Sequence, residues 1–325
     1  MTKKKQSIFT SQKFIVLLVV IGLMIVFSLI SKDFRKYTTL LSMLDYSYYD
    51  VLMAIGVAFP LITGGVDLSI GTGMVCYALA GGYLIRFHSW PVGAAILVSI
   101  LFGCAIGLLN GVLIAIMDLP PFLATLCTCM ITRGLGSICS GSFGIPWPIA
   151  NADNGWFHSI FKITLASGTK IPLGFLWMVL LALLMAFVLG HTKFGRYVIA
   201  IGSNKEATIL SGINVKFYHV MAYVVCGLFA GLASISYANA IPTVQPGTGA
   251  GMELDAIGGA IVGGVSATGG YGTIIGTLLG TYVICLLKTG LPYIGLQANW
   301  QQIITGLVLI GAVLIDILKK ERIKK

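Results

Sequence analysis

Ten apolar runs separated by short polar stretches constrain this sequence more than any other feature. A helix needs about 20 apolar residues to cross a bilayer, and fewer where it is kinked or re-entrant. Hydrophobic residues make up 57% of the 325 residues and charged residues 10%, whereas a soluble domain carries about 25% charged residues. We therefore predict an all-α polytopic membrane protein of about ten transmembrane helices, some of them broken or re-entrant. The runs are 14–30, 48–63, 70–85, 92–117, 122–140, 173–189, 218–238, 254–265, 274–287 and 300–318.

The whole chain, 1–325, is predicted to form a single transmembrane domain, with a membrane-spanning bundle over 14–318. An even number of spans places both termini on one side of the membrane. The lysines at 3–5 and the basic tail at 319–325 indicate that this side is cytoplasmic, because Lys and Arg concentrate in cytoplasmic segments. The net charge of +10 follows this topology. No basic stripe suggests a nucleic-acid partner, and membrane lipid is the expected surrounding.

Two outer connections carry residues that bear on this topology. Three basic residues at 32–36 fall on the outer side and count against it. The connection 141–172 is rich in Gly and Pro and contains Trp147 and Trp156. Aromatic residues there suit a membrane interface or a lid over an entry pathway, and an interfacial anchor is the favoured interpretation for each tryptophan.

The loop 192–216 is the longest polar and basic interruption between apolar runs in the second half of the chain. Its four basic residues and single acid predict a cytoplasmic position. Ser203 or Asn204 can cap a short helix there. Glu206 would lie in the first turn of that helix, and Gly212 would end it. Such a helix has the right shape to dock into a groove on a partner; an ordinary surface loop is the alternative.

Asp67 and Glu253 are acids placed near the starts of predicted helices. Asp67, or the neighbouring Ser69, can cap the third span, so a structural role is favoured. The functional alternative is a broken segment in which Asp67 faces water or a partner. Glu253 stabilises the N-terminus of the eighth span by its charge, and an outer gate is the alternative.

Asn110, Arg133 and Asn239 are polar residues at or near membrane depth. We expect their side chains to face the bundle interior, where they could line a polar pathway or join helices. For any one of the three, joining helices is the favoured interpretation.

Pairs of glycines four residues apart occur at 103 and 107 and at 276 and 280, and each pair begins a segment that reaches a Leu-Pro dipeptide. Small residues at this spacing allow close packing of helices. The two segments are the fourth and ninth predicted spans, which cross in opposite directions. They suggest an inverted repeat, a common plan in transporters.

Sequence motifs of catalysis are missing. The segment 190–197 lacks the lysine and hydroxyl of a phosphate-binding loop, and we find no nucleophile elbow, zinc motif or catalytic acid pair. The seven cysteines lie in or beside apolar runs and should pack as small apolar residues. We expect no enzyme activity, cofactor or metal site. Charged groups within the spans are too few to suggest a proton relay of the kind found in secondary pumps. If this chain carries out uphill transport, we expect the energy to come from another subunit.

Four stretches in order also carry a family resemblance. They are GGVDLSIG at 64–71, NG with LPPFLATL and RG over 110–134, GR with AIG, NKEA and SGINV over 195–215, and GME with GG, GGYG and GTLLG over 251–280. Together they resemble the permease subunits of bacterial ABC importers for ribose, xylose, galactose and related sugars. One departure is KTGL at 288–291, where that family usually has Asn-Gly-Leu.

The resemblance implies a multi-pass subunit of the bacterial inner membrane that imports a monosaccharide. Its implied partners are a cytoplasmic ATP-binding subunit, an external sugar-binding protein, and a second permease copy or a paralogue. It also implies that the loop 192–216 holds the coupling helix. The residues assigned to coupling are Arg196, Asn204, Lys205, Glu206 and Gly212.

Three alternatives remain at this stage. The ligand could be a furanosyl signalling molecule or a nucleoside, which related carriers import. A stand-alone secondary transporter is a different class, and it would need coupling charges at the membrane midplane. A membrane scaffold without transport is the third, and polar residues near bilayer depth argue against it.

Overall fold

The computed structural model describes residues 12–150, 155–165 and 168–324. Each of the ten predicted apolar runs lies largely within a helix, and among the described residues seven helices are long and apolar enough to cross a membrane. The chain is thus a mostly helical, polytopic membrane protein. The seven are α1 (Gln12–Ile30), α3 (Ile70–His88), α4 (Val92–Ala115), α5 (Pro121–Cys139), α6 (Leu173–His191), α9 (Val215–Ala240) and α11 (Ile274–Tyr293).

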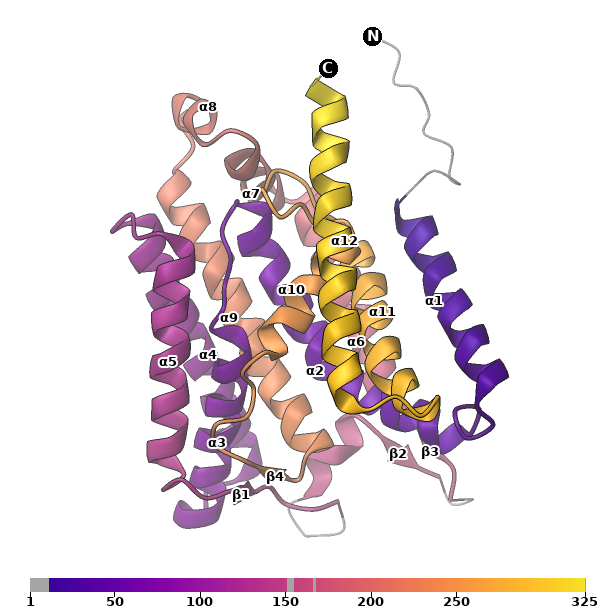
Figure 1. Cartoon of the computed structure of the whole chain (residues 1–325). Helices are drawn as coiled ribbons and strands as arrows, with labels where there is room; N and C mark the ends of the chain where they lie inside the picture. Colours follow the sequence, from indigo (N-terminus) through magenta and orange to yellow (C-terminus); the bar gives the residue numbers. More distant parts are fainter. Residues whose placement is uncertain (1–11, 151–154, 166–167, 325) are drawn as a thin grey trace.

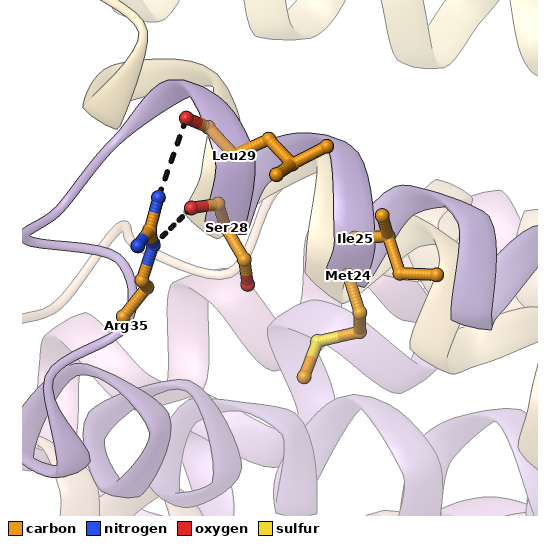
Figure 2. A pocket seen from close by; sticks show the side chains of 5 residues that line it. All are labelled: Met24, Ile25, Ser28, Leu29 and Arg35. Carbon is orange, nitrogen blue, oxygen red and sulfur yellow. Dashed lines mark hydrogen bonds between the residues drawn. The ribbon is translucent and has the colours of Figure 1, made fainter.

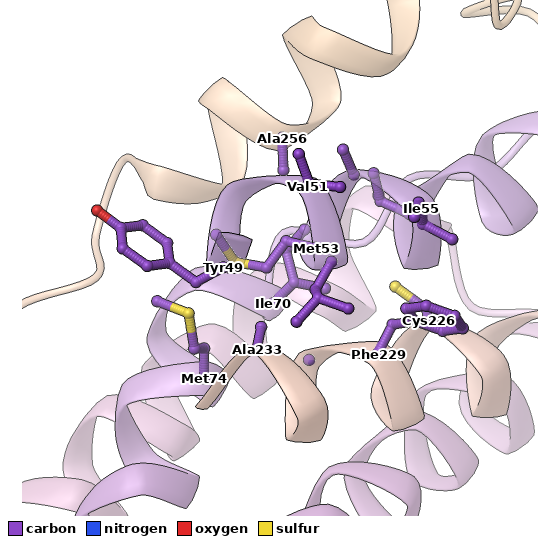
Figure 3. Close-up of a cluster of buried hydrophobic side chains, with 14 of the residues drawn as sticks. Tyr49, Val51, Met53, Ile55, Ile70, Met74, Cys226, Phe229, Ala233 and Ala256 are labelled. Atoms are coloured by element: carbon purple, nitrogen blue, oxygen red, sulfur yellow. The ribbon is translucent and has the colours of Figure 1, made fainter. Parts of the chain in front are cut away.

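The remaining apolar runs form α2 (Tyr37–Ile62), α10 (Met252–Val262) and α12 (Ala298–Lys324). α2 is the centre of the bundle, and every residue from Ser47 to Thr63 is buried. Figure 3 shows why: side chains of α2 such as Met53 pack among Ile70 of α3, Phe229 of α9 and Ala256 of α10.

Two helices begin part-way through the bundle. The segment 63–69 leaves the end of α2 and runs back along the bundle before α3 starts (Figure 1). α10 has only 11 residues and follows a non-helical segment that includes β4 (Thr243–Val244). The starts of α3 and α10 meet, because a Cβ atom on Gly71 would lie 2.5 Å from both the Glu253 Oε2 atom and the Gly249 carbonyl oxygen.

Both glycine pairs noted in the sequence, at 103 and 107 and at 276 and 280, lie where helices pack closely. In α4, a Cβ atom on Gly103 or Gly107 would overlap backbone atoms of α9. In α11, a Cβ atom on Gly276 or Gly280 would overlap the backbone of α10 or the turn after it. α4 and α11 run in opposite directions (Figure 1). The pairs nevertheless pack on different kinds of partner, one on a full-length helix and the other on a short one.

Short strands and a 3-10 helix fold over the end of the bundle opposite α7 and α8 (Figure 1). Trp147 is 2% exposed, and its Nε1 atom donates to the Ala78 carbonyl oxygen at 2.9 Å. The prediction that Trp147 is an interfacial anchor is therefore wrong, because its indole is buried against α3. Trp156, in contrast, is 52% exposed. The elements are β1 (Ile145–Pro146) paired with β4, η2 (Gly155–Ile160), and β2 (Ile163–Thr164) paired with β3 (Lys170–Ile171).

Two of the three basic residues at 32–36, Arg35 and Lys36, interact with neighbouring residues in the chain. Figure 2 shows Arg35 donating to the carbonyl oxygens of Ser28 and Leu29, in the last turn of α1. These atoms line an apolar cavity of about 320 Å³ on the side of α1. Lys36 pairs with Asp33 at 2.6 Å. A cation at a helix C-terminus is stabilised by the helix dipole, so Arg35 serves α1 locally.

Candidate coupling surface and transport path

Two capped helices form the loop 192–216. The Thr192 hydroxyl accepts from the Gly195 backbone N–H at 3.2 Å and starts α7 (Lys193–Ser203). The Asn204 Oδ1 atom accepts from the Ala207 N–H at 2.9 Å and starts α8 (Lys205–Leu210). The predicted cap is Asn204, since Ser203 is instead the last residue of α7.

The other predicted features of α8 are also present. Glu206 lies in its first turn, and Gly212 follows its end with a φ of +74°. This backbone conformation favours glycine, because a Cβ atom would be strained there.

α8 projects from the end of the bundle (Figure 1), and two of its apolar side chains are exposed. Leu210 is 88% exposed and Ile209 is 54% exposed, whereas Thr208 is buried. Lys205 and Glu206 are exposed on the same short helix. An exposed apolar tip with charged neighbours is typical of a protein interaction site.

Backbone contacts tie α7 to the core of the bundle. A Cβ atom on Gly202 would overlap the Ile62 carbonyl oxygen at the end of α2. The same carbonyl accepts from the Gly270 N–H at 2.8 Å, and the Ser203 hydroxyl donates to the Gly270 carbonyl at 3.3 Å. Arg196 donates to the His191 carbonyl at 3.2 Å, across the junction of α6 and α7. A movement of α7 would therefore be transmitted to α2, α6 and the turn before α11.

Asp67 lies in a buried polar network rather than at a surface. Its Oδ1 atom accepts from the Ser69 N–H at 2.9 Å and the Ser69 hydroxyl at 2.6 Å. Asn110 donates to Ser69 at 2.9 Å and accepts from the Thr128 hydroxyl at 2.8 Å. Asp67 is 1% exposed and Asn110 is 0% exposed. The network joins the starting segment of α3 to α4 and α5, so a joining role is what the geometry supports.

Asn239 and Glu253 occupy junctions between elements. The Asn239 Oδ1 atom lies 2.7 Å from the His158 Nδ1 atom, which links α9 to η2. The Glu253 carboxylate accepts from the Gly251 N–H at 3.0 and 3.1 Å, beside the start of α3. Their roles in a pathway or gate stay predictions.

Arg133 is exposed on α5, which corrects the expectation that its side chain faces the bundle interior. The neighbouring Met130 is 70% exposed and Ile131 is 49% exposed. The charge therefore shares an apolar face that the other described helices leave open.

The sequence interpretation also missed an ion cluster inside the bundle. Lys288 of α11 lies between Asp255 of α10 and Asp50 of α2. Asp50 stands inside the run 48–63, and Lys288 directly follows the run 274–287, so both positions are visible in the sequence. The sequence does not show that these residues are close in space, because they are far apart along the chain. The expectation of few charged groups within the spans therefore overlooked this cluster of three.

A family model described as "Branched-chain amino acid transport system / permease component" matches residues 39–313. The chain belongs to this family of transport-system permease components. The family resemblance carried by the four sequence stretches is confirmed by similar proteins of known name. No solved structure matches the chain.

Three named relatives illustrate the similarity. The ribose import permease protein RbsC of Escherichia coli (strain K12) is 34% identical over 302 residues, which cover 92% of this chain and 92% of that protein. The galactose/methyl galactoside import permease protein MglC of the same strain is 33% identical over 323 residues, 96% of this chain and 95% of that protein. RbsC of Bacillus subtilis (strain 168) is 34% identical over 295 residues, 90% of this chain and 89% of that protein.

Proposed function

We propose that this chain is the transmembrane subunit of an ATP-driven ABC importer in the bacterial inner membrane. It would form the pathway for a monosaccharide delivered by an external binding protein. The carrying observation is the similarity, over nine-tenths or more of the chain, to import permeases named for ribose and for galactose. The chain itself is not the enzyme, and ATP hydrolysis belongs to a separate subunit.

Coupling to that subunit is assigned to α8. Its support is the exposed tip of Ile209 and Leu210 and the fixed geometry that Asn204 and Gly212 give the helix. ATP-driven closure of the ATPase pair would push α8, and α7 would pass the movement to the end of α2 through Gly202. Arg196 holds the α6–α7 junction during this movement, and Lys205 and Glu206 offer charges to the partner.

The topology proposed has ten spans, counting α2, α10 and α12 with the seven long apolar helices. The beginning of α1 and the end of α12 lie at the same end of the bundle as α7 and α8 (Figure 1). If α8 meets a cytoplasmic ATPase, both termini are cytoplasmic, in agreement with their basic residues. An inverted repeat is supported by the opposite directions of α4 and α11 and by the meeting starts of α3 and α10.

A second permease copy or a paralogue is the proposed neighbour of the exposed α5 face. Arg133 in contact with lipid hydrocarbon would be costly, whereas a protein or a water-filled pathway would accommodate its charge. Dimerisation would thus cover a charge that the single chain leaves open.

A tagged pull-down from native membranes after mild crosslinking tests the proposal. We expect mass spectrometry to find an ATP-binding subunit and a secreted sugar-binding protein, and the ligand on the latter would name the substrate. A known ABC complex serves as the control for preservation. If that control survives and this chain is recovered alone, a stand-alone secondary transporter becomes the better explanation, since the Lys288 cluster could then serve ion coupling.

A further inference from the structure

The ion cluster of Lys288, Asp255 and Asp50 lies outside both the coupling surface and the Asp67 network. The Lys288 Nζ atom is 2.8 Å from the Asp255 Oδ2 atom and 3.8 Å from the Asp50 Oδ2 atom. The Asp50 side chain is 5% exposed, although it lies close to the middle of the 26-residue helix α2. Charge at membrane depth is costly and is retained mainly where it serves substrate or ion movement.

Two cavities flank this cluster, and Lys288 and Gln301 line both. One has a volume of about 520 Å³ and lies among α10, α11 and α12, with Asp255 in its wall. The other has a volume of about 440 Å³ and lies among α2, α11 and α12, with Asp50 in its wall. Both volumes are in the range of small-molecule sites, about 300–1,000 Å³.

Asp50 has a hydrogen-bonding atom that the protein does not use. Its Oδ1 atom is buried and, within the part of the chain that the structure describes, has no hydrogen-bond partner. The Oδ2 atom of the same carboxylate accepts the Cys285 thiol at 3.7 Å and faces Lys288. A buried acceptor without a donor is unfavourable. A molecule in the adjoining cavity that donates a hydroxyl hydrogen would satisfy it.

We propose that Lys288, Asp255 and Asp50, with Gln301, bind the hydroxyl groups of an uncharged polyol as it passes between the two cavities. The inference rests on the proposed import function and names the residues and the ligand class of its pathway. Carboxylates accept hydrogen bonds from hydroxyl groups, while the ammonium of Lys288 and the amide of Gln301 donate to them.

The charge and the wall of the site favour this ligand class. With all three groups ionised, two carboxylates and one ammonium sum to −1, so an anionic sugar is repelled. The rings of Tyr46, Tyr49 and Tyr293 line the Asp50 cavity and give the carbon face of a sugar an apolar surface. A few polar groups within a largely apolar wall are typical of small-ligand sites.

The test compares the complete transporter carrying wild-type permease with one carrying Asp50→Asn, Asp255→Asn and Lys288→Gln together. The triple change removes every charge at once, so no unpaired ion is left buried. The matched control is Asp45→Asn with Lys162→Gln. Asp45 is also on α2, but its ion-pair partner Lys162 lies between η2 and β2, and neither residue lines either cavity.

We expect the triple variant to assemble with its ATPase and to keep ATP hydrolysis stimulated by the loaded binding protein. Its uptake of D-ribose and D-galactose should fall about tenfold or more, while the control variant stays within about twofold of wild type. Uptake by the triple variant at the wild-type rate would overturn the assignment of these residues. Absence of ATP-driven sugar uptake by the wild-type complex would instead overturn the proposed function.

A second measurement tests the ligand class without the binding protein. D-galactose should raise the melting temperature of the purified wild-type complex more than that of the triple variant, because ligand bound to the native state stabilises it. General solvent effects of a sugar act equally on both proteins. D-galacturonate at the same concentration should show no such difference. An equal difference with both probes would overturn the preference for an uncharged ligand.

Discussion

Replacement of Leu210 by alanine should weaken coupling without harming the permease itself. Leu210 is 88% exposed in the single chain, so its truncation removes little packing within this subunit. In the proposed complex, the side chain is buried against the ATPase. Truncation removes three carbon atoms, and at about 0.8 kcal/mol for each the loss is about 2.4 kcal/mol. This corresponds to about 60-fold weaker docking of each coupling helix.

The assay is retention of the ATPase on the tagged permease during purification, followed by ATP-driven sugar uptake in vesicles. We expect both to fall for Leu210→Ala, with unchanged amounts of permease in the membrane. Leu176→Ala is the matched control, because Leu176 is also an exposed leucine, at 54%, but lies on α6 and not on α8. Wild-type retention and uptake by Leu210→Ala, or equal losses in both variants, would refute the coupling assignment.

Four further predictions follow from named contacts. Asn204→Ala removes the cap of α8 and should cost about 1 kcal/mol of local stability, which hydrogen exchange of α8 amides would detect as faster exchange. Gly212→Trp places a side chain at a φ of +74°, which is strained for any residue with a Cβ atom. We expect this variant to insert in the membrane and to support ATP hydrolysis without sugar uptake. Wild-type uptake would contradict the role of this turn. Asn110→Leu removes the amide that donates to both Asp67 carboxylate oxygens at 3.4 Å and to the Ser69 hydroxyl, and it should lower the free energy of unfolding by about 1–3 kcal/mol; Asn239→Leu, at the η2 junction, is the comparison. Gly107→Leu forces α4 away from α9, so the detergent-purified protein should lose its sharp melting transition, whereas Gly134→Leu, in open space on α5, should keep it.

Close backbone packing and polar junctions together explain how a movement could cross this bundle. Gly202 brings α7 against the end of α2, and α2 then passes through the core to Asp50. The proposed coupling surface on α8 is thus connected through α7 and α2 to Asp50 of the proposed ligand site. A displacement of α2 by the ATPase would change the distance between Asp50 and Lys288, which come from different helices.

Local features were readable from the sequence because they depend on neighbours along the chain. The apolar runs predicted the helices, since twenty apolar residues have a favourable place only in a membrane or a core. The cap at Asn204 and the turn at Gly212 were predictable because both follow from hydrogen bonds and backbone angles within a few residues. The glycine spacing in α4 likewise predicted a close contact, although not the partner.

Tertiary structure decided what distant segments do to one another. Trp147 is buried because its indole packs on α3, where a carbonyl accepts its N–H. Arg133 is exposed because no other helix among the described residues packs over that face of α5. Asp50, Asp255 and Lys288 are single charges in separate segments, and only the packing of α2, α10 and α11 makes them one cluster. Composition and spacing indicate whether a segment is exposed to water, to lipid or to the protein core. The pairing of buried charges depends instead on which helices become neighbours.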